Sequence, residues 1–438
     1  MEILIMAGQL ILGLSILVGL HELGHLLAAK MFGMRVEQYF IGFPPKVFSI
    51  KRGETEYGLG AVPLGGFVKI SGMIDESLDT EQMKAPPKPW EFRAKPAWQR
   101  LVVMLGGIIV NIITGIVVFV ALTYKNGNTF LAAEDAKYGI VAYDLAREIG
   151  LQTGDRIVKI NGKPFSDFYA IRSSDVFLGN NSYYTVERNG QLVDVYIPNN
   201  FIEKLSDKKS AGPFVEPIQP FKVKELAPDQ PAARAGLRKD DIITSVNGRP
   251  IRFYHEFQDA VKPLAGKPIV LGVERNGNPV TLNLTVTPEG TIGFYPEFLL
   301  KYTTQEYTFG EAVVVGTQRA FQVVYDNIKG FGKIFRGDVS ASKAISGPIG
   351  IAQNLFGGVW VWERFWAITG LLSMALAFMN ALPIPALDGG HSVLLLYEIV
   401  SGRKPSDRFL EAAQRVGMVI LLGLMAFAIF NDVFKAVF

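Results

Sequence analysis

The sequence contains no cysteine among its 438 residues. This absence excludes disulfide bonds, zinc sites built from thiolates and a cysteine nucleophile. Charge of one sign is also scarce, because the formal net charge is only +3, which is too small to indicate a nucleic-acid partner. Histidine is rare as well, with four in the chain, so any histidine-based metal site has few side chains to choose from.

Apolar residues, in contrast, make up 49% of the chain and gather in four runs. A helix needs about 20 apolar residues to cross a bilayer. We therefore predict a multi-span α-helical membrane protein with four transmembrane helices, over residues 3–31, 101–124, 366–400 with a break near 383–388, and 413–436. The first run lacks a basic start and a small-residue cleavage site, so we expect a retained span and not a signal peptide.

Lysine and arginine gather in two of the connecting segments, over residues 32–97 and 403–408. Short loops rich in these residues stay in the cytoplasm. We therefore expect both loops on the cytoplasmic side, and both termini and the long segment of about residues 125–364 on the other side. Long domains cross membranes largely regardless of their charge, so the basic residues of that segment do not oppose this orientation.

The long outer segment contains an internal repeat. Residues 150–164 recur as residues 236–250, and residues 186–190 recur as residues 273–277. Each copy has short apolar strands and Asn-Gly pairs, which favour tight turns because both residue types tolerate positive φ. The second copy, at residues 235–251, resembles a PDZ domain, and the first is a looser match. The resemblance implies two tandem α+β PDZ domains, over residues 125–221 and 222–305, that either bind extended peptides at a sheet edge or act as spacers or filters.

A short motif at the end of the first apolar run is typical of zinc enzymes. Residues His21 to His25 read H-E-x-x-H. Positions i and i+4 share one face of a helix, so His21 and His25 can bind one zinc ion while Glu22 takes a proton from water. The alternative is that the histidines only cap the span at the membrane interface. That alternative leaves Glu22 without a role in apolar surroundings, where ionisable residues are costly.

A catalytic zinc ion needs a third protein ligand and one open position. His255 lies in the second repeat, which the charge pattern puts on the far side of the membrane. Asp388 and His391 both lie in the third apolar region, where two prolines interrupt the helix and free backbone groups. Such irregular backbone must be buried or line a cavity, so Asp388 is expected to be a buried carboxylate that needs a partner, which a metal would supply.

The motifs taken together resemble the site-2 protease family of intramembrane zinc metalloproteases. The likeness rests on H-E-x-x-H in the first span, N-x-x-P-x-P-x-L-D-G-G at residues 380–390 and the PDZ repeats between them, and it covers essentially the whole chain. It implies Zn²⁺ as the cofactor, Asn380 as a substrate contact and Glu22 as the catalytic base. The metal ligands that it implies are His21, His25 and Asp388. His391 is then either a partner of these ligands or a locally packed residue.

The resemblance also implies a reaction and a place for it. The enzyme would hydrolyse a peptide bond within or near a transmembrane segment, with zinc-activated water and Glu22 as the general base. Its partners would be the lipid bilayer and single-span membrane proteins, either an anti-sigma factor or remnant signal peptides in stress-response signalling, and not nucleic acid. The chain would lie in the bacterial inner membrane, with the PDZ domains in the periplasm and the active site near the cytoplasmic side.

A glycine-rich stretch within the first cytoplasmic loop is a candidate for substrate binding. Residues 57–70 are apolar, strand-like at their end and unsuited to a long helix. We predict a membrane-associated β-hairpin here, whose edge pairs with an unwound substrate through residues that include Gly65, Gly66, Phe67 and Val68. An ordinary surface loop is the alternative.

Two further interpretations concern the rest of the chain. Residues 306–364 form a connecting segment in which Phe309–Phe335 has helical amphipathic spacing, so this helix lies on the outer membrane surface or packs on the PDZ pair. As a whole, the chain could also be a non-catalytic membrane scaffold that presents two PDZ modules. A transporter is a further alternative, because broken helices with buried charge also mark ion sites, but the spans show no inverted repeat.

Overall fold

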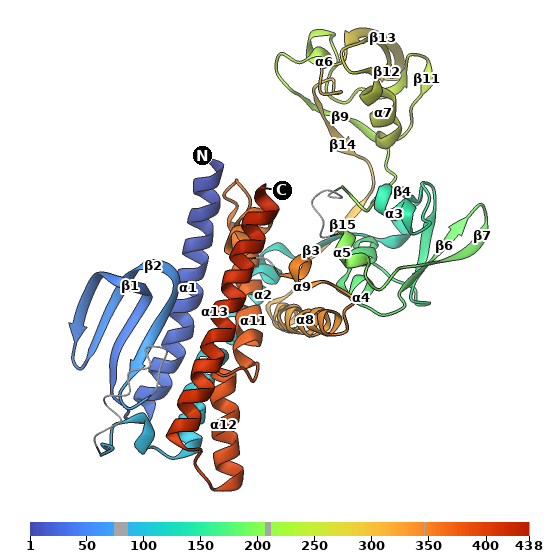
Figure 1. Cartoon of the computed structure of the whole chain (residues 1–438). Helices are drawn as coiled ribbons and strands as arrows, with labels where there is room; N and C mark the ends of the chain where they lie inside the picture. The colour runs from blue at the N-terminus through green and yellow to red at the C-terminus, as the bar shows by residue number, and fades with distance from the viewer. Residues whose placement is uncertain (74–85, 206–211, 346, 438) are drawn as a thin grey trace. The chain divides into compact units, whose positions relative to one another are not determined.

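The structure is a computed structural model that describes residues 1–73, 86–205, 212–345 and 347–437. It divides into two compact units (Figure 1), one made of Met1–Gly127 and Glu306–Phe438 and the other of Asn128–Gln305. Parts of two predicted regions, at residues 74–85 of the first loop and 206–211 of the first repeat, lie outside the described residues.

The first unit contains the helices that are long and apolar enough to cross a membrane. Within the described residues there are four of them by length and composition: α1 (Glu2–Met31), α2 (Ala97–Asn126), α11 (Trp362–Ala381) and the Arg408–Phe434 part of α13 (Asp407–Val437). The 30-residue helices α1 and α2 are about 45 Å long and exceed the ~30 Å hydrocarbon layer, so they extend beyond it or tilt within it.

The third predicted span consists of two helices separated by a break, close to the predicted position. The chain leaves α11 at Ala381 and re-enters a helix, α12, at Asp388, and α12 (Asp388–Ser401) is only 14 residues long. Asp388 therefore begins a helix at the C-terminal end of the predicted break. An acidic residue is favourable in the first turn because the helix dipole is positive there, which explains why the helix restarts at this carboxylate.

Helix α2 is the centre of the first unit, since it packs against α1, α8 (Phe309–Phe335), α11 and α12. It approaches α1 closely where Gly24 faces Gly106, because a Cβ atom on either glycine would collide with the backbone of the other helix. Small residues allow such close packing in membranes, where lipid supplies no hydrophobic drive for helices to associate. The contact places α2 directly beside the H-E-x-x-H turn.

Helix α8 forms over the predicted amphipathic range. Thr308 and Glu311 cap its first turn reciprocally, and it packs against α2 and α11. Short elements connect the long helices elsewhere in this unit: η2 (Phe92–Ala94), α9 (Ala341–Ala344), α10 (Pro348–Ile351) and η7 (Ala352–Phe356). The C-terminal helix holds one of these connections, because the Asp432 carboxylate accepts hydrogen bonds from the backbone amides of Gly347 and Gly350.

A β-sheet follows α1 and is larger than the predicted hairpin. It is built from β1 (Val36–Arg52) and β2 (Thr55–Ile70). The two strands fold over, so that Phe40 of β1 is opposite Gly58 and also opposite Phe67, while residues 66–70 pair only with the start of β1. Residues 66–70 therefore form one edge of this sheet, and β2 packs on α1.

The second unit contains both copies of the sequence repeat, each with its own apolar core. The strands and helices of the first copy are β4 (Ile140–Ala142), α3 (Asp144–Glu148), β5 (Arg156–Ile160), η4 (Phe168–Arg172), α4 (Ser174–Phe177), β6 (Tyr183–Arg188), β7 (Gln191–Tyr196), α5 (Phe201–Leu205) and β8 (Val215–Pro217). Strands β5, β6 and β7 form one antiparallel sheet, and β4 pairs with β8.

The second copy repeats this arrangement. Its elements are β9 (Phe221–Leu226), α6 (Pro231–Arg234), β10 (Ile242–Val246), β11 (Arg249–Pro250), α7 (Tyr254–Val261), η6 (Lys262–Leu264), β12 (Pro268–Arg275), β13 (Asn278–Thr285) and β14 (Phe294–Phe298). The sheet order is β11-β10-β12-β13, and β14 pairs with β9. The flanking strands β3 (Asn128–Leu131) and β15 (Tyr302–Gln305) pair with each other, so the two ends of the unit meet.

An ion pair shows how closely the two copies correspond. In each, a buried aspartate binds at 2.7 Å an arginine at the end of β6 or β12, the strands that pair with β5 and β10, and the same arginine donates to a glycine carbonyl at 2.8 Å. The residues are Asp155, Arg188 and Gly150 in the first copy and Asp241, Arg275 and Gly236 in the second. The duplication therefore holds at the level of individual contacts.

Candidate functional site

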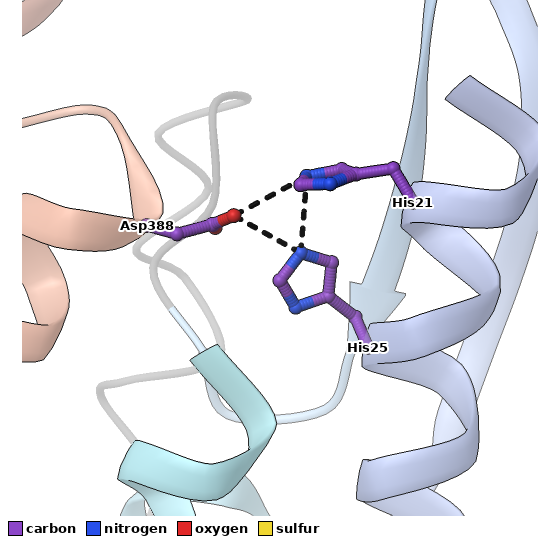
Figure 2. Close-up of side chains that lie close together, drawn as sticks. All are labelled: His21, His25 and Asp388. Atoms are coloured by element: carbon purple, nitrogen blue, oxygen red, sulfur yellow. Dashed lines mark hydrogen bonds and ion pairs between the residues drawn. The ribbon is translucent and has the colours of Figure 1, made fainter. Parts of the chain in front are cut away.

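Three side chains predicted to bind a metal converge from two helices (Figure 2). The Nε2 atoms of His21 and His25 lie 3.2 and 3.3 Å from Oδ2 of Asp388, and 3.3 Å from each other. The histidines, at 8% and 6% exposure, are buried, and the Asp388 side chain is 14% exposed. Within the described residues, no other group of three or more His, Asp or Glu side chains comes together in this way.

The spacing of these three atoms fits a zinc ion. Zinc bonds of about 2.0–2.1 Å at tetrahedral angles put two donor atoms about 3.3–3.4 Å apart, close to the separations of 3.2–3.3 Å observed here. Among the described residues, the buried Oδ2 of Asp388 also accepts no well-formed hydrogen bond. A buried carboxylate oxygen without such a bond is costly unless a cation compensates it, so the three donors are suited to one metal ion.

The backbone around Asp388 explains why this carboxylate reaches the histidines. The chain turns between α11 and α12 with Ala386 at φ +78°, a conformation that side chains rarely adopt. Gly389 and Gly390 then pack on the backbone of the same turn, where Cβ atoms would collide with the carbonyls of Leu382 and Ile384. The two glycines allow the turn to fold tightly against the start of α12, so that Asp388 projects toward α1.

Helix α2 supports both histidines from behind. Nδ1 of His25 lies 2.8 Å from the carbonyl oxygen of Val103, and Nδ1 of His21 lies 3.0 Å from the side-chain amide of Asn111. Gly107 lies between them, and a Cβ atom there would collide with both imidazole rings. Our sequence reasoning missed all three positions in this role; the one available signal was Asn111, a polar residue within an apolar run.

Glu22 lies beside the edge of the sheet. The backbone amide of Val68 donates a hydrogen bond to its carboxylate, and a Cβ atom on Gly66 would lie 3.5 Å from Cγ of Glu22. The neighbouring residues named in the prediction have other surroundings, because Phe67 stacks on Phe40 and Gly65 packs against the Phe43 ring. Two of the four predicted contact residues, Gly66 and Val68, are thus next to the expected base.

Of the three other residues considered for the site, Asn380 lies beside the metal-binding side chains, whereas His391 and His255 have other partners. The Asn380 amide nitrogen lies 3.3 Å from Nε2 of His21, so this residue is part of the group. His391 instead hydrogen-bonds to Gln414 and lines a small cavity with Arg100 and Glu398. His255 is in the second unit, where it stacks on Phe253.

Known proteins are similar to this chain over nearly its whole length. Residues 9–424 match Peptidase family M50. The regulator of sigma-E protease RseP of Escherichia coli is 30% identical over 96% of this chain and 97% of its own length. The same protein of Salmonella typhimurium is 29% identical over 96% and 97%. A Neisseria meningitidis protein named as a candidate zinc metalloprotease is 30% identical over 97% of both chains.

These matches extend from the H-E-x-x-H helix to the C-terminal span and so include every residue of the site. The four apolar helices fit a multi-span protein of the inner membrane, whose substrates are membrane proteins. The cofactor of this family is zinc. The chain belongs to Peptidase family M50 and is a site-2-type zinc metalloprotease.

Proposed function

We propose that this protein cleaves peptide bonds within or near transmembrane segments, with zinc held by His21, His25 and Asp388 and with Glu22 as the general base. The observation that carries the proposal is the triangle of donor atoms, which are 3.2–3.3 Å apart. This spacing matches three corners of a tetrahedral zinc site and leaves the fourth corner for water or substrate.

The chemistry divides between the metal and the chain. Bound zinc would act as a Lewis acid, which would polarise the scissile carbonyl and make water acidic enough to deprotonate near neutral pH. Glu22 follows His21 directly on α1, so its carboxylate can take the proton of the attacking water and pass it to the leaving amine. The Asn380 amide, 3.3 Å from Nε2 of His21, is in reach of a substrate carbonyl at the metal.

We propose that the edge of β2 at residues 66–70 presents the substrate. A transmembrane helix has its backbone groups bonded internally, so it must unwind before it can be cleaved, and the freed groups then need new partners. Residues 66–70 can supply them by strand addition, because they pair with β1 on one side only. The amide of Val68 contacts Glu22, so a strand added at this edge would run beside the catalytic base.

The substrate class is inferred from the relatives. Two of them are named regulators of sigma-E protease. We propose that the substrates of this protein are single-span membrane proteins, either an anti-sigma factor or remnant signal peptides. The orientation predicted from basic loops would put the active site near the cytoplasmic side.

We also propose that the two repeats are tandem PDZ domains on the periplasmic side. Their support is the matched pattern of strands, helices and the Asp–Arg–Gly contacts. They would bind extended peptide segments or exclude bulky ectodomains. A scaffold without catalysis would keep these modules but would not need Glu22.

The test is cleavage of a single-span substrate by the purified full chain in detergent, with Glu22→Gln beside wild type and zinc measured in both. Loss of a general base costs roughly 10²–10⁴-fold in rate. We expect that loss with about one zinc ion per chain in each protein. Equal cleavage by the variant would reject Glu22 as the base, and a folded wild type without zinc would reject the site.

A further inference from the structure

Asn111 is the most deeply buried polar residue next to the metal ligands. It lies in the middle of α2, is 0% exposed and is surrounded by an apolar sequence. Its backbone carbonyl accepts a hydrogen bond of 2.8 Å from the Ser373 hydroxyl, so the helix position is fixed independently of the side chain. Its side-chain amide lies 3.0 Å from Nδ1 of His21, and its Oδ1 has no hydrogen-bond partner among the described residues.

The direction of the Asn111–His21 hydrogen bond follows from the chemistry of imidazole. A neutral imidazole has one N–H and one lone pair, so a histidine that offers Nε2 to a cation must have its hydrogen on Nδ1. That Nδ1–H needs an acceptor. The oxygen and nitrogen of an asparagine amide are assigned from their hydrogen-bond partners, and turning this amide by 180° presents Oδ1 to Nδ1 and gives the unpartnered oxygen a donor.

His25 shows the same arrangement without ambiguity. Its Nδ1 lies 2.8 Å from the Val103 carbonyl oxygen, which can only accept a hydrogen bond. This contact therefore fixes the hydrogen on Nδ1 and leaves Nε2 free for a metal. Helix α2 thus faces both histidines with acceptors, one from the backbone and one from a side chain, and only the second can be removed by mutation.

We propose that Asn111 is a positioning residue whose Oδ1 accepts the Nδ1–H of His21, holding this histidine in the tautomer and orientation that present Nε2 to zinc. This inference rests on the proposed role of His21 as a ligand. An amide suits the position because it accepts a hydrogen bond without adding charge. The charges of Zn²⁺, Asp388 and an ionised Glu22 already sum to zero.

The competing explanation is that Asn111 only holds helices together, since buried amides bond across membrane helices. Three variants of the full chain separate the two roles. Asn111→Leu keeps most of the volume and removes the acceptor, whereas Asn111→Asp keeps an acceptor oxygen in the same place. Ser373→Ala is the matched packing control, because it removes a buried hydrogen bond to the same residue without changing what faces His21.

The measurement is Zn²⁺ affinity in detergent by competition with a chelator, together with the visible absorption of the Co²⁺-substituted proteins. Loss of a residue that orients a histidine ligand typically costs 10–100-fold in metal affinity. We expect that loss and an altered Co²⁺ spectrum for Asn111→Leu, affinity within about threefold of wild type for Asn111→Asp, and no change for Ser373→Ala.

Several results would overturn the inference. Affinity of Asn111→Leu within about twofold of wild type would show that His21 needs no acceptor. An Asn111→Asp variant weakened as much as Asn111→Leu would show that an acceptor oxygen at this position is not enough to support His21. If Asn111→Leu fails to fold, Asn111→Asp decides alone. A wild type that binds no Zn²⁺, or binds it equally well after Asp388→Ala, would instead reject the proposed metal site itself.

Discussion

Aspartates that are largely shielded from solvent in the two units differ in how their charge is balanced. In the second repeat, Asp241 is 1% exposed and binds the Arg275 guanidinium through both oxygens, at 2.8 and 2.7 Å, and one of these oxygens also accepts from the Arg238 amide. In the membrane unit, Asp388 faces only two imidazole nitrogens at 3.2–3.3 Å, and its Oδ2 accepts no well-formed hydrogen bond. A carboxylate with a full set of partners stabilises its own fold, whereas one that lacks them is available to a ligand.

Burial within the membrane unit does not by itself cause this difference between the aspartates. Asp432 of α13 is also buried there, at 5% exposure, and its carboxylate accepts from the amides of Gly347 and Gly350 at 2.9 and 2.8 Å. A buried carboxylate in this unit can therefore be satisfied by the protein alone. What sets Asp388 apart is its position opposite His21 and His25.

The largest expected effect comes from removing the charge of Asp388. We expect Asp388→Asn to lose zinc and cleavage together, since an amide is a poor replacement for an anionic ligand. Zinc content of the purified protein and cleavage of a single-span substrate measure this. Asp241→Asn is the matched control and should keep both. Retention of about one zinc ion by Asp388→Asn would remove the distinction between the two aspartates.

The next effect concerns the sheet edge beside Glu22. Val68→Pro removes the amide that donates to Glu22, because proline has no N–H, and it disrupts the strand edge beside which an added strand would lie. We expect cleavage to fall at least about tenfold with zinc retained, since this edge would orient the substrate and not the metal. Val68→Ala keeps the amide and should cleave at nearly the wild-type rate. Normal cleavage by a folded Val68→Pro would exclude strand addition here.

A smaller effect is expected on stability in the repeats. Arg275→Met leaves the Asp241 charge buried without its main partner. Breaking such a pair lowers the unfolding free energy, and the partial exposure of the arginine makes the loss smaller than for a fully buried pair. Denaturant unfolding of the full chain, followed by circular dichroism, measures this loss of unfolding free energy. The corresponding Arg188→Met should behave alike, and a difference above about 2 kcal/mol between the two would show that the copies are not equivalent.

The smallest expected effect is a pH dependence of the unfolding free energy of the same unit. Burial raises the pKa of Asp241, but the hydrogen bonds from Arg275 and the Arg238 amide outweigh it and hold the pKa below the ordinary value of 3.8. A carboxyl group with a lowered folded-state pKa stabilises the fold at neutral pH and loses that contribution as the pH falls below its ordinary pKa. We expect the unfolding free energy to decline below about pH 4, and to decline less in Asp241→Asn. If the unfolding free energy fell equally with pH in wild type and Asp241→Asn, the contacts of Asp241 with Arg275 and the Arg238 amide would not account for the pH dependence.

Local motifs account for the parts of the site that the sequence could predict. H-E-x-x-H needs only helical spacing to bring His21 and His25 together, and the two prolines before Asp388 predict a break that forces a buried carboxylate to find a partner. The structure brings these three residues and Asn380 together. Their roles, like the bounds of the PDZ domains, remain predictions.

What the sequence could not predict depends on contacts between distant segments. Val103 and Asn111 support histidines that are 78 and 90 positions away, and no local pattern encodes such a pairing. The extent of the sheet was also missed. Residues 57–70 have a composition that indicates strand, but composition does not show that residues 57–59 lie between two parts of β1 while residues 66–70 form an edge.

The most direct test of the account is zinc K-edge X-ray absorption on the purified full chain. We expect one zinc ion whose nearest shell holds two imidazole nitrogens and a carboxylate oxygen at about 2.0–2.1 Å. In His25→Ala we expect a shell with fewer imidazole nitrogens. A folded protein without bound zinc, or a zinc shell without imidazole, would contradict it.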